Sequence, residues 1–286
     1  MFRQVGIIGT GRVAQALALG LGAHSVALPL IWGRSPTHCE AAVERVGHCR
    51  TASSVAALVN TCDVIAIAVA DDAFPGIVEV IGTAGSLAHA PLIFHVSGST
   101  GSAVLDPLCA QGARTAAIHP AMTFTGAPEV EVRRMKSACF AITAPDAAIS
   151  HARQVVGGLG GTAIEIAEYN RPLYHAALCH AANHLVTLFT GSLRMLGAAG
   201  VDDAARVIAP LAYAALENSI AQGFDALSGP VLRGDTKTVR NHLAALEHAC
   251  PETLPTYRAM ALATLTELER EGGERTRSAL HRLLDD

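Results

Sequence analysis

A group of side chains in the second half of the chain could move protons. Within a stretch of helical pattern, His175, Cys179 and Asn183 follow one another at intervals of four residues. At roughly 100° per residue, Cys179 lies about 40° and Asn183 about 80° from His175, so the three share one stripe of a helix. Imidazole titrates near neutral pH, so His175 could protonate an oxygen that Asn183 orients. The alternative interpretation of His175 is a structural histidine whose hydrogen bonds are made within the protein.

Two further histidines of this helix raise the question of a metal site. His180 and His184 lie roughly 140° and 180° from His175, on another face, at a spacing that could chelate a metal ion. The zinc motif with this spacing, His-Glu-x-x-His, has a glutamate that is missing here. No third ligand is evident in the sequence, and we therefore predict no metal cofactor.

A glycine-rich turn near the start of the chain predicts a phosphate-binding site. The apolar run at residues 5–8 leads into Gly9, Gly11 and Ala14, where a helical pattern begins. Gly9 permits the tight turn, Gly11 lets a backbone approach a pyrophosphate, and Ala14 lets helix and strand pack closely. The helix N-terminus offers free N–H groups to the phosphates. The alternative is a turn that binds no ligand, but the position of this glycine-rich stretch directly after the first predicted strand favours a dinucleotide site. The expected residues of this site are Gly9, Thr10, Gly11, Arg12 and Val13.

The end of the second predicted strand indicates which dinucleotide binds. An NAD site usually has a carboxylate there, which accepts from the ribose 2′-hydroxyl. This chain has Arg34 and Ser35 instead, with no carboxylate before Glu40. A guanidinium and a hydroxyl suit a 2′-phosphate, so we predict NADP as the cofactor. The alternative interpretation of Arg34 is a solvated turn residue.

Small and polar residues follow further predicted strands. If the sheet is parallel, the carboxyl ends of its strands line one cleft, where ligands bind. Val69 and Ala70 are expected to pack on the cofactor. The turn after the next strand could hold the nicotinamide amide or a substrate carboxylate, although such a sequence is also ordinary turn chemistry. Its residues are Ser97, Gly98 and Ser99.

The elements that must position these side chains divide the chain into two parts. Short apolar strands alternate with helical patterns in the first half, which predicts an α/β fold with a parallel sheet. From about Asn170 onward the pattern is helical almost throughout. We therefore predict a Rossmann-type dinucleotide-binding domain over residues 1–168 and an all-helical domain over residues 169–286.

Composition places the chain among globular proteins, since 50% of its 286 residues are hydrophobic and 16% are charged. The net charge of −4 and the lack of a basic run argue against nucleic acid as a partner. Seven scattered cysteines without a Cys-x-x-Cys pair predict free thiols in a reducing cytosol. With no signal peptide and no apolar run that could span a bilayer, we predict a cytoplasmic protein without a membrane partner.

These stretches together resemble a known superfamily. A dinucleotide domain followed by a helical domain is similar to the 6-phosphogluconate dehydrogenase-like group, which includes β-hydroxyacid dehydrogenases, ketopantoate reductase and pyrroline-5-carboxylate reductase. More narrowly, the chain resembles a bacterial family in which a Rossmann-like domain is fused to a domain of unknown function. The matching stretches are residues 9–14, 32–35, 119–124, 174–177 and 229–235, together with Asn183.

The resemblance implies roles for particular residues. The long helix of ketopantoate reductase carries a lysine followed by asparagines four and eight residues later. Aligning Asn183 with the second asparagine puts His175 at the position of the catalytic lysine, which is a departure because the charge of a histidine depends on pH near 7. The segment at residues 229–235 would close over the substrate, with Arg233 a candidate for its carboxylate. His119 could face the nicotinamide. The alternatives are a surface position for Arg233 and a simple turn at His119.

The resemblance thus implies an NADP-dependent reductase of a small carboxylated keto compound, similar to ketopantoate reductase. A cyclic imine reductase of the pyrroline-5-carboxylate type is the enzymatic alternative. The second alternative is a non-catalytic NADP-binding regulatory protein, because the catalytic lysine of ketopantoate reductase is missing here. The long helix, rich in alanine, and the apolar helical domain favour a homodimer.

Overall fold

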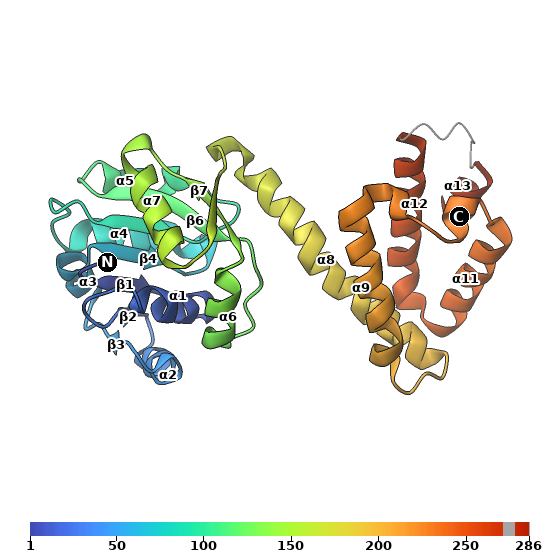
Figure 1. Ribbon diagram of the computed structural model, residues 1–286, viewed down its shortest axis with the longest axis horizontal. Coiled ribbons are helices and arrows are strands. Elements are labelled where there is room, and N and C mark those ends of the chain that lie inside the picture. The colour runs from blue at the N-terminus through green and yellow to red at the C-terminus, as the bar shows by residue number, and fades with distance from the viewer. Residues whose placement is uncertain (271–277, 286) are drawn as a thin grey trace. The chain divides into compact units, whose positions relative to one another are not determined.

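The computed structural model describes residues 1–270 and 278–285. The chain divides into two compact units, Met1–His180 and Ala181–Asp286, and the division falls within the long helix α8 (Arg171–Ala198) (Figure 1). Residues 271–277 and 286 of the predicted helical domain lie outside the described residues. The predicted domain boundary after residue 168 stays a prediction.

The first unit is built on one eight-stranded sheet with the order β3-β2-β1-β4-β5-β6-β7-β8. The first six strands are parallel, whereas β7 runs antiparallel to β6 and parallel to β8. The predicted α/β class is therefore confirmed, with a reversal at the last two strands. The strands are β1 (Val5–Ile8), β2 (Leu30–Trp32), β3 (Arg50–Thr51), β4 (Val64–Ile67), β5 (Leu92–His95), β6 (Arg114–Pro120), β7 (Cys139–Thr143) and β8 (Thr162–Glu165).

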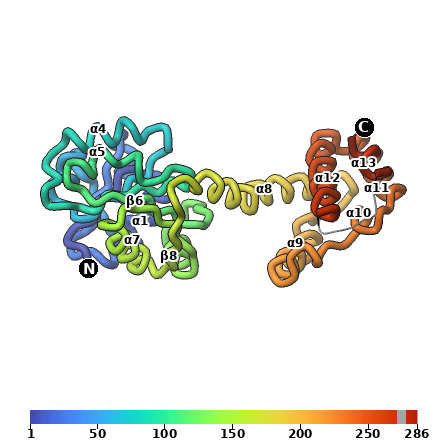
Figure 2. The backbone as a smooth tube through the Cα atoms, turned by 90° about the horizontal axis from the view of Figure 1, so that it is seen from above, coloured from blue at the N-terminus to red at the C-terminus, as the bar shows by residue number. Residues whose placement is uncertain are grey.

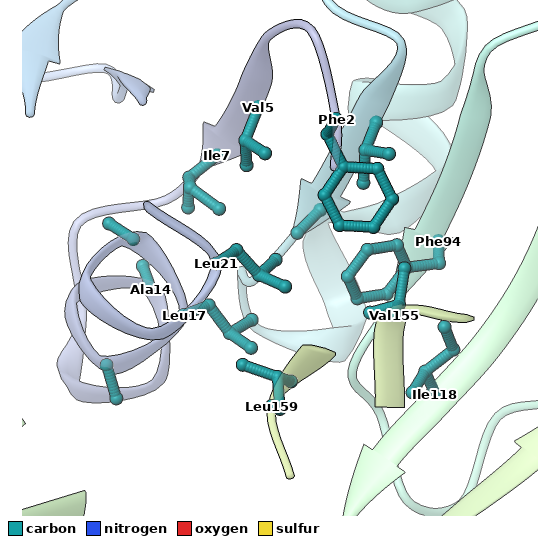
Figure 3. Close-up of a cluster of buried hydrophobic side chains, with 14 of the residues drawn as sticks. Phe2, Val5, Ile7, Ala14, Leu17, Leu21, Phe94, Ile118, Val155 and Leu159 are labelled. Carbon is teal, nitrogen blue, oxygen red and sulfur yellow. The ribbon is translucent and has the colours of Figure 1, made fainter. Parts of the chain in front are cut away.

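Helices cover both faces of this sheet, which is why the central strands are continuous apolar runs. Successive residues of a strand point to opposite faces, so Ile7 joins one buried cluster and Ile8 the other. Figure 3 shows part of the first cluster, to which the covering helices contribute Leu17 and Val155 and the sheet contributes Phe94. The helices of the unit are α1 (Arg12–Gly22), α2 (Pro36–Val46), α3 (Val55–Thr61), α4 (Phe74–Ala84), α5 (Asp106–Cys109), α6 (Pro128–Met135) and α7 (Asp146–Gly158), with short 3₁₀ turns η1 (Asp71–Ala73), η2 (Ser102–Leu105) and η3 (Glu168–Asn170).

The second unit is helical throughout its described residues, as the sequence predicts. Its helices after α8 are α9 (Ala204–Gln222), α10 (Pro230–Arg233), α11 (Thr236–Ala249), α12 (Leu254–Arg270) and α13 (Ser278–Asp285), with 3₁₀ turns η4 (Gly223–Ala226) and η5 (Pro251–Thr253). A small core forms where α11, α12 and α13 lie side by side, with Val239, Leu265 and Leu280 among its members (Figures 1 and 2). Among the described residues, no helix is both long enough and apolar enough to cross a membrane.

Candidate active site

The predicted dinucleotide turn connects β1 to α1. Gly9 has a φ of +125°, and a Cβ at this position would overlap the carbonyl oxygen of Ala68. Only glycine tolerates this conformation and this approach. The N–H of Gly9 donates to the carbonyl of Trp32 at 2.8 Å, so the turn is fixed between neighbouring strands. Gly11 has open space around its Cβ position, as an approaching ligand would need.

A cleft of about 1030 Å³ opens beside this turn, at the carboxyl ends of β1, β2 and β4. Ligands of open α/β sheets bind at such an edge. Ser35 caps α2, since its hydroxyl accepts the N–H of His38 at 3.4 Å. Seven of the predicted cofactor residues line the cleft: Gly9, Thr10, Gly11, Arg34, Ser35, Val69 and Ala70.

The other three predicted cofactor residues lie elsewhere. Arg12 lines a neighbouring cavity of about 480 Å³, which shares Thr10 with the cleft. Val13 packs against the hydrophobic core of the unit, where α1 covers the sheet. Ser97 follows β5, and its hydroxyl donates to the carboxylate of Asp71 at 2.6 Å.

The carboxylate of Asp71 ties down the whole turn after β5. The same oxygen, Oδ2, accepts from the hydroxyls of Ser97, of Ser99 at 3.2 Å and of Thr100 at 3.4 Å. The two serines that are predicted to hold a ligand therefore donate their hydroxyl hydrogen bonds to Asp71. A negative charge is also placed beside the turn, and the sequence-based prediction did not include it.

A second group of side chains gathers where the start of α8 meets β6. Nδ1 of His119 lies 2.9 Å from the hydroxyl of Tyr174, and the rings of His119 and His175 lie 5.8 Å apart at 83°. Nε2 of His175 lies 3.7 Å from the sulfur of Cys179, as their helical spacing predicts. A Cβ on Gly98 would overlap the ring of His175 and come within 3.0 Å of Nε2 of His119. The cluster thus requires a glycine at position 98.

His119 does not lie in a turn, which was the alternative that the sequence left open. It lies within β6, paired with Ala141 of β7, because the antiparallel pairing with β7 extends β6 to Pro120. The ring is thereby fixed by the sheet rather than by a turn.

Arg171, the first residue of α8, is fully buried beneath this cluster. Its guanidinium donates to the hydroxyl of Thr143 at 2.8 Å and to the carbonyl oxygens of Ser97 at 3.1 Å, Ala117 at 2.8 Å and Ala141 at 3.0 Å. Arginine can make such a set because it carries five N–H donors in a planar fork. Arg171 is a cation at the N-terminus of α8, where the positive end of the helix dipole disfavours a positive charge. This unfavourable position is the one sequence signal that could have suggested a tertiary role for Arg171.

The buried arginine and the burial itself set the charge state of the neighbouring histidines. Burial lowers the pKa of His119 to about 4, and the positive charges of His175 and Arg171 act in the same direction. Burial also lowers the pKa of His95, whose Nε2 lies 2.8 Å from the carbonyl of Gly101. Because the N–H of Ser97 donates to Nδ1 of His95, that nitrogen is unprotonated and Nε2 carries the proton. Both histidines are therefore neutral near pH 7.

Burial raises the pKa of the Tyr174 hydroxyl, although the charge of Arg171 opposes this. Tyr174 thus keeps its proton near pH 7 and holds it within hydrogen-bond distance of His119. The sequence predicted no role for Tyr174, because its partner comes from a strand 55 positions earlier.

The remaining predicted residues belong to the second unit. Asn183 lies on α8 and is exposed, and Arg233 is the exposed last residue of α10. Asp235 caps α11 by accepting the N–H of Thr238 at 3.0 Å. Within residues 1–270 and 278–285, no three His, Cys, Asp or Glu side chains are grouped so that they could hold a metal ion. The absence of a metal cofactor stays a prediction.

Two protein-family models match consecutive parts of the chain. Residues 2–120 match a Rossmann-like domain, and residues 138–264 match DUF2520, a domain of unknown function. No curated protein is similar enough to count as a match.

Solved structures with the same fold cover nearly the whole chain. A proposed NADP oxidoreductase from Bacteroides fragilis has a TM-score of 0.76 at 18% identity, over 92% of this chain and 98% of its own. A protein from Thermotoga maritima has a TM-score of 0.64 at 20% identity, over 93% and 99%. An imine reductase from Myxococcus stipitatus, solved with NADP⁺, has a TM-score of 0.66 at 16% identity, over 98% and 99%. The chain thus combines a region that matches a Rossmann-like domain with a region that matches DUF2520, and it shares its fold with these solved structures.

Proposed function

We propose that this protein is an NADP-dependent reductase of a small molecule that contains a C=O or C=N bond. The observation that carries the proposal is the cluster of His119, Tyr174 and His175 around Gly98, in the same unit as the dinucleotide cleft. Reduction of a carbonyl leaves an alkoxide, which needs a proton donor within reach. The cluster offers such donors at the carboxyl ends of β5 and β6, the edge of the sheet where ligands bind.

The residues of the cleft fit a dinucleotide with a 2′-phosphate. Gly9 and Gly11 leave the space that a pyrophosphate needs, and the end of β2 carries Arg34 and Ser35 in place of a carboxylate. A guanidinium recognises a phosphate through paired, charge-assisted hydrogen bonds. When bound, NADPH supplies the hydride.

Within the cluster, we assign proton donation to His175. His119 stays neutral near pH 7, since burial lowers its pKa to about 4, and it is hydrogen-bonded to Tyr174. We therefore assign His119 the positioning and polarising of the substrate, and His175 the transfer of the proton. The roles expected for Asn183 and Arg233, which lie in the second unit, stay predictions.

For the substrate, our leading proposal is a small carboxylated keto compound of the ketopantoate type. A specific observation favours imine reduction as a second candidate. The exposed carboxylate of Asp71 beside the turn at residues 97–100 would attract a cationic iminium better than an anionic keto acid. Proteins of this fold include an imine reductase from Myxococcus stipitatus and a reductive aminase from Aspergillus terreus.

A substrate panel tests this proposal. Purified protein with NADPH is mixed with keto acids, with cyclic imines and with ketones plus amines, and the loss of NADPH absorbance is followed. Turnover of one class identifies the reaction. Silence across the panel, with NADPH binding intact, would replace the proposal by a non-catalytic NADP-binding regulator. With the true substrate, His175→Ala should lower kcat at least a hundredfold, consistent with the usual contribution of a general acid. The exposed His248→Ala is the matched control, and full turnover in His175→Ala would show that the assigned acid is wrong.

We also propose that the functional form is a homodimer that covers α9. No residue of this helix is buried, yet it carries large apolar side chains on opposite sides, including Leu211 at 70% and Ile220 at 78% exposure. A helix that is apolar all round is normally buried, and a second copy is the commonest partner. Light scattering should give twice the chain mass of 29.6 kDa, and Leu211→Glu with Ile220→Glu should reduce it to one chain. A monomeric wild-type protein would contradict this.

A further inference from the structure

A second cavity beside the dinucleotide turn collects basic side chains. It measures about 480 Å³ and lies between the first turn of α1, the face of α2 that runs from His38 to Arg45 and the loop at residues 121–127. Arg12, His38 and Arg45 line it, and no aspartate or glutamate is among its lining residues. It shares Thr10 and His38 with the 1030 Å³ cleft, so the two are neighbours across these side chains.

The loop at residues 121–127 holds both arginines. Nη1 of Arg12 donates to the carbonyl oxygen of Phe124 at 3.3 Å, and Nη1 of Arg45 donates to that of Gly126 at 3.1 Å. Gly126 has a φ of +94°, and its Cβ position lies 3.6 Å from Cγ of Arg12, so the arginine stem packs over the glycine. Two arginines from different helices are therefore directed to the same short loop.

The loop itself is fixed from behind by a buried carboxylate. Oε1 of Glu131, in α6, accepts the backbone N–H groups of Thr125, Gly126 at 2.7 Å and Ala127 at 3.4 Å. Glu131 is completely buried. Because its N–H groups are already bound, the loop presents its carbonyls to Arg12 and Arg45. The arginine positions are thus preorganised by the fold.

This arrangement concentrates positive charge at one place. Each guanidinium has five N–H donors, and each of these arginines gives one to the loop in the bonds described. The residues that line the cavity include no acidic side chain. Cations gathered without a counterion repel one another, and a bound anion removes that cost.

The lining of the cavity indicates which phosphate fits. Gly9 and Gly11, where a pyrophosphate would lie, belong to the cleft and not to this cavity. The shared residue His38 instead lies one turn after Ser35, at the end of the cleft where the ribose 2′-position is expected. A group that enters the cavity past Thr10 and His38 would come from the ribose rather than from the pyrophosphate.

We propose that Arg12 and Arg45 form a subsite for the 2′-phosphate of the cofactor, opposite Arg34 and Ser35, and so determine the preference for NADP over NAD. This inference rests on the proposed function, and it makes the loop at residues 121–127 a positioning element for cofactor specificity. A dianionic phosphate held from two sides by guanidinium groups is bound more tightly and more selectively than one held at a single turn.

Binding of two small probes tests the subsite without any substrate. Calorimetry gives the Kd of 2′,5′-ADP, which carries the 2′-phosphate, and of 5′-AMP, which lacks it. Arg45→Ala and Arg12→Ala should each weaken 2′,5′-ADP at least fivefold and leave 5′-AMP within twofold. The exposed Arg133→Ala, which removes a charge from α6 and lines neither cavity, is the matched control and should change neither Kd.

The outcomes separate this inference from the proposed function. If the wild-type protein binds both probes equally, the proposed NADP preference fails and the subsite with it. If the wild-type protein prefers 2′,5′-ADP and Arg34→Ala abolishes the preference while Arg45→Ala and Arg12→Ala keep it, only the subsite is overturned. Equal weakening of both probes would also overturn it, since that result indicates a general effect on the dinucleotide turn. Arg45 is exposed on α2, so its replacement by alanine should leave the fold intact, and thermal unfolding checks this.

Discussion

The dinucleotide turn and the histidine cluster belong to the same unit, but they depend on different parts of the sequence. The turn is made by consecutive residues, and Gly9 and Gly11 carry out their roles through the backbone. The cluster combines Gly98 after β5, His119 in β6 and His175 in α8. A contiguous site depends on local conformation, whereas a dispersed one depends on what holds its segments together. Here a single buried side chain, Arg171 of α8, bonds to the other two segments and also to β7.

The largest expected effect is therefore at Arg171. Arg171→Leu leaves the carbonyls of Ser97, Ala117 and Ala141 without these buried donors. We expect a loss of about 4 kcal/mol in the free energy of unfolding, because each unpaired buried group costs about 1–3 kcal/mol. Urea denaturation measures it. Leu at the exposed position Arg133 is the control, and an unchanged midpoint in Arg171→Leu would refute the role given to the buried arginine.

At the turn, two glycines in the same motif should behave differently. Gly9→Ala would force a Cβ onto the carbonyl of Ala68 at a φ of +125°, so we expect a loss of about 3 kcal/mol in stability. Gly11→Ala has open space and should unfold like the wild-type protein, yet weaken NADPH binding through the added methyl. Thermal unfolding and calorimetry of the two variants separate the effects. Equal stability of the two variants would contradict the described turn.

The histidine cluster, unlike the turn, should make stability depend on pH. In the unfolded chain His119 binds a proton near pH 6.5, but in the folded chain only near pH 4. Acid therefore favours unfolding: this contribution is present above about pH 6.5 and is lost as the pH falls toward 4. The pKa difference corresponds to about 3 kcal/mol. His119→Gln keeps a hydrogen-bonding group near Tyr174 but does not titrate, so its unfolding free energy should fall less between pH 6.5 and 4. Parallel pH profiles would disprove a buried, neutral His119.

The same contrast explains what the sequence could predict. The strand-turn-helix at Gly9, the basic end of β2 at Arg34 and the proximity of His175 to Cys179 follow from local periodicity and side-chain chemistry, and seven of the predicted cofactor residues line one cleft. The contacts of Tyr174 with His119, and of Asp71 with the turn at residues 97–100, join segments that are distant in sequence. Nothing in a local pattern specifies them.

Strand direction is a further property that local patterns leave open. An apolar run at residues 139–143 predicts a strand, but not its reversal relative to β6. That reversal places His119 inside a strand and fixes its ring. The sequence pattern thus located the strand, while the direction of the chain after α6 decided the geometry of the cluster.

The affinity of the wild-type protein for NADPH and for NADH, measured by calorimetry under one salt concentration, tests the central claim most directly. We predict that NADPH binds at least tenfold more tightly, a difference of about 1.4 kcal/mol, and that Arg34→Ala removes most of this preference. Equal affinities for the two cofactors in the wild-type protein would contradict the account.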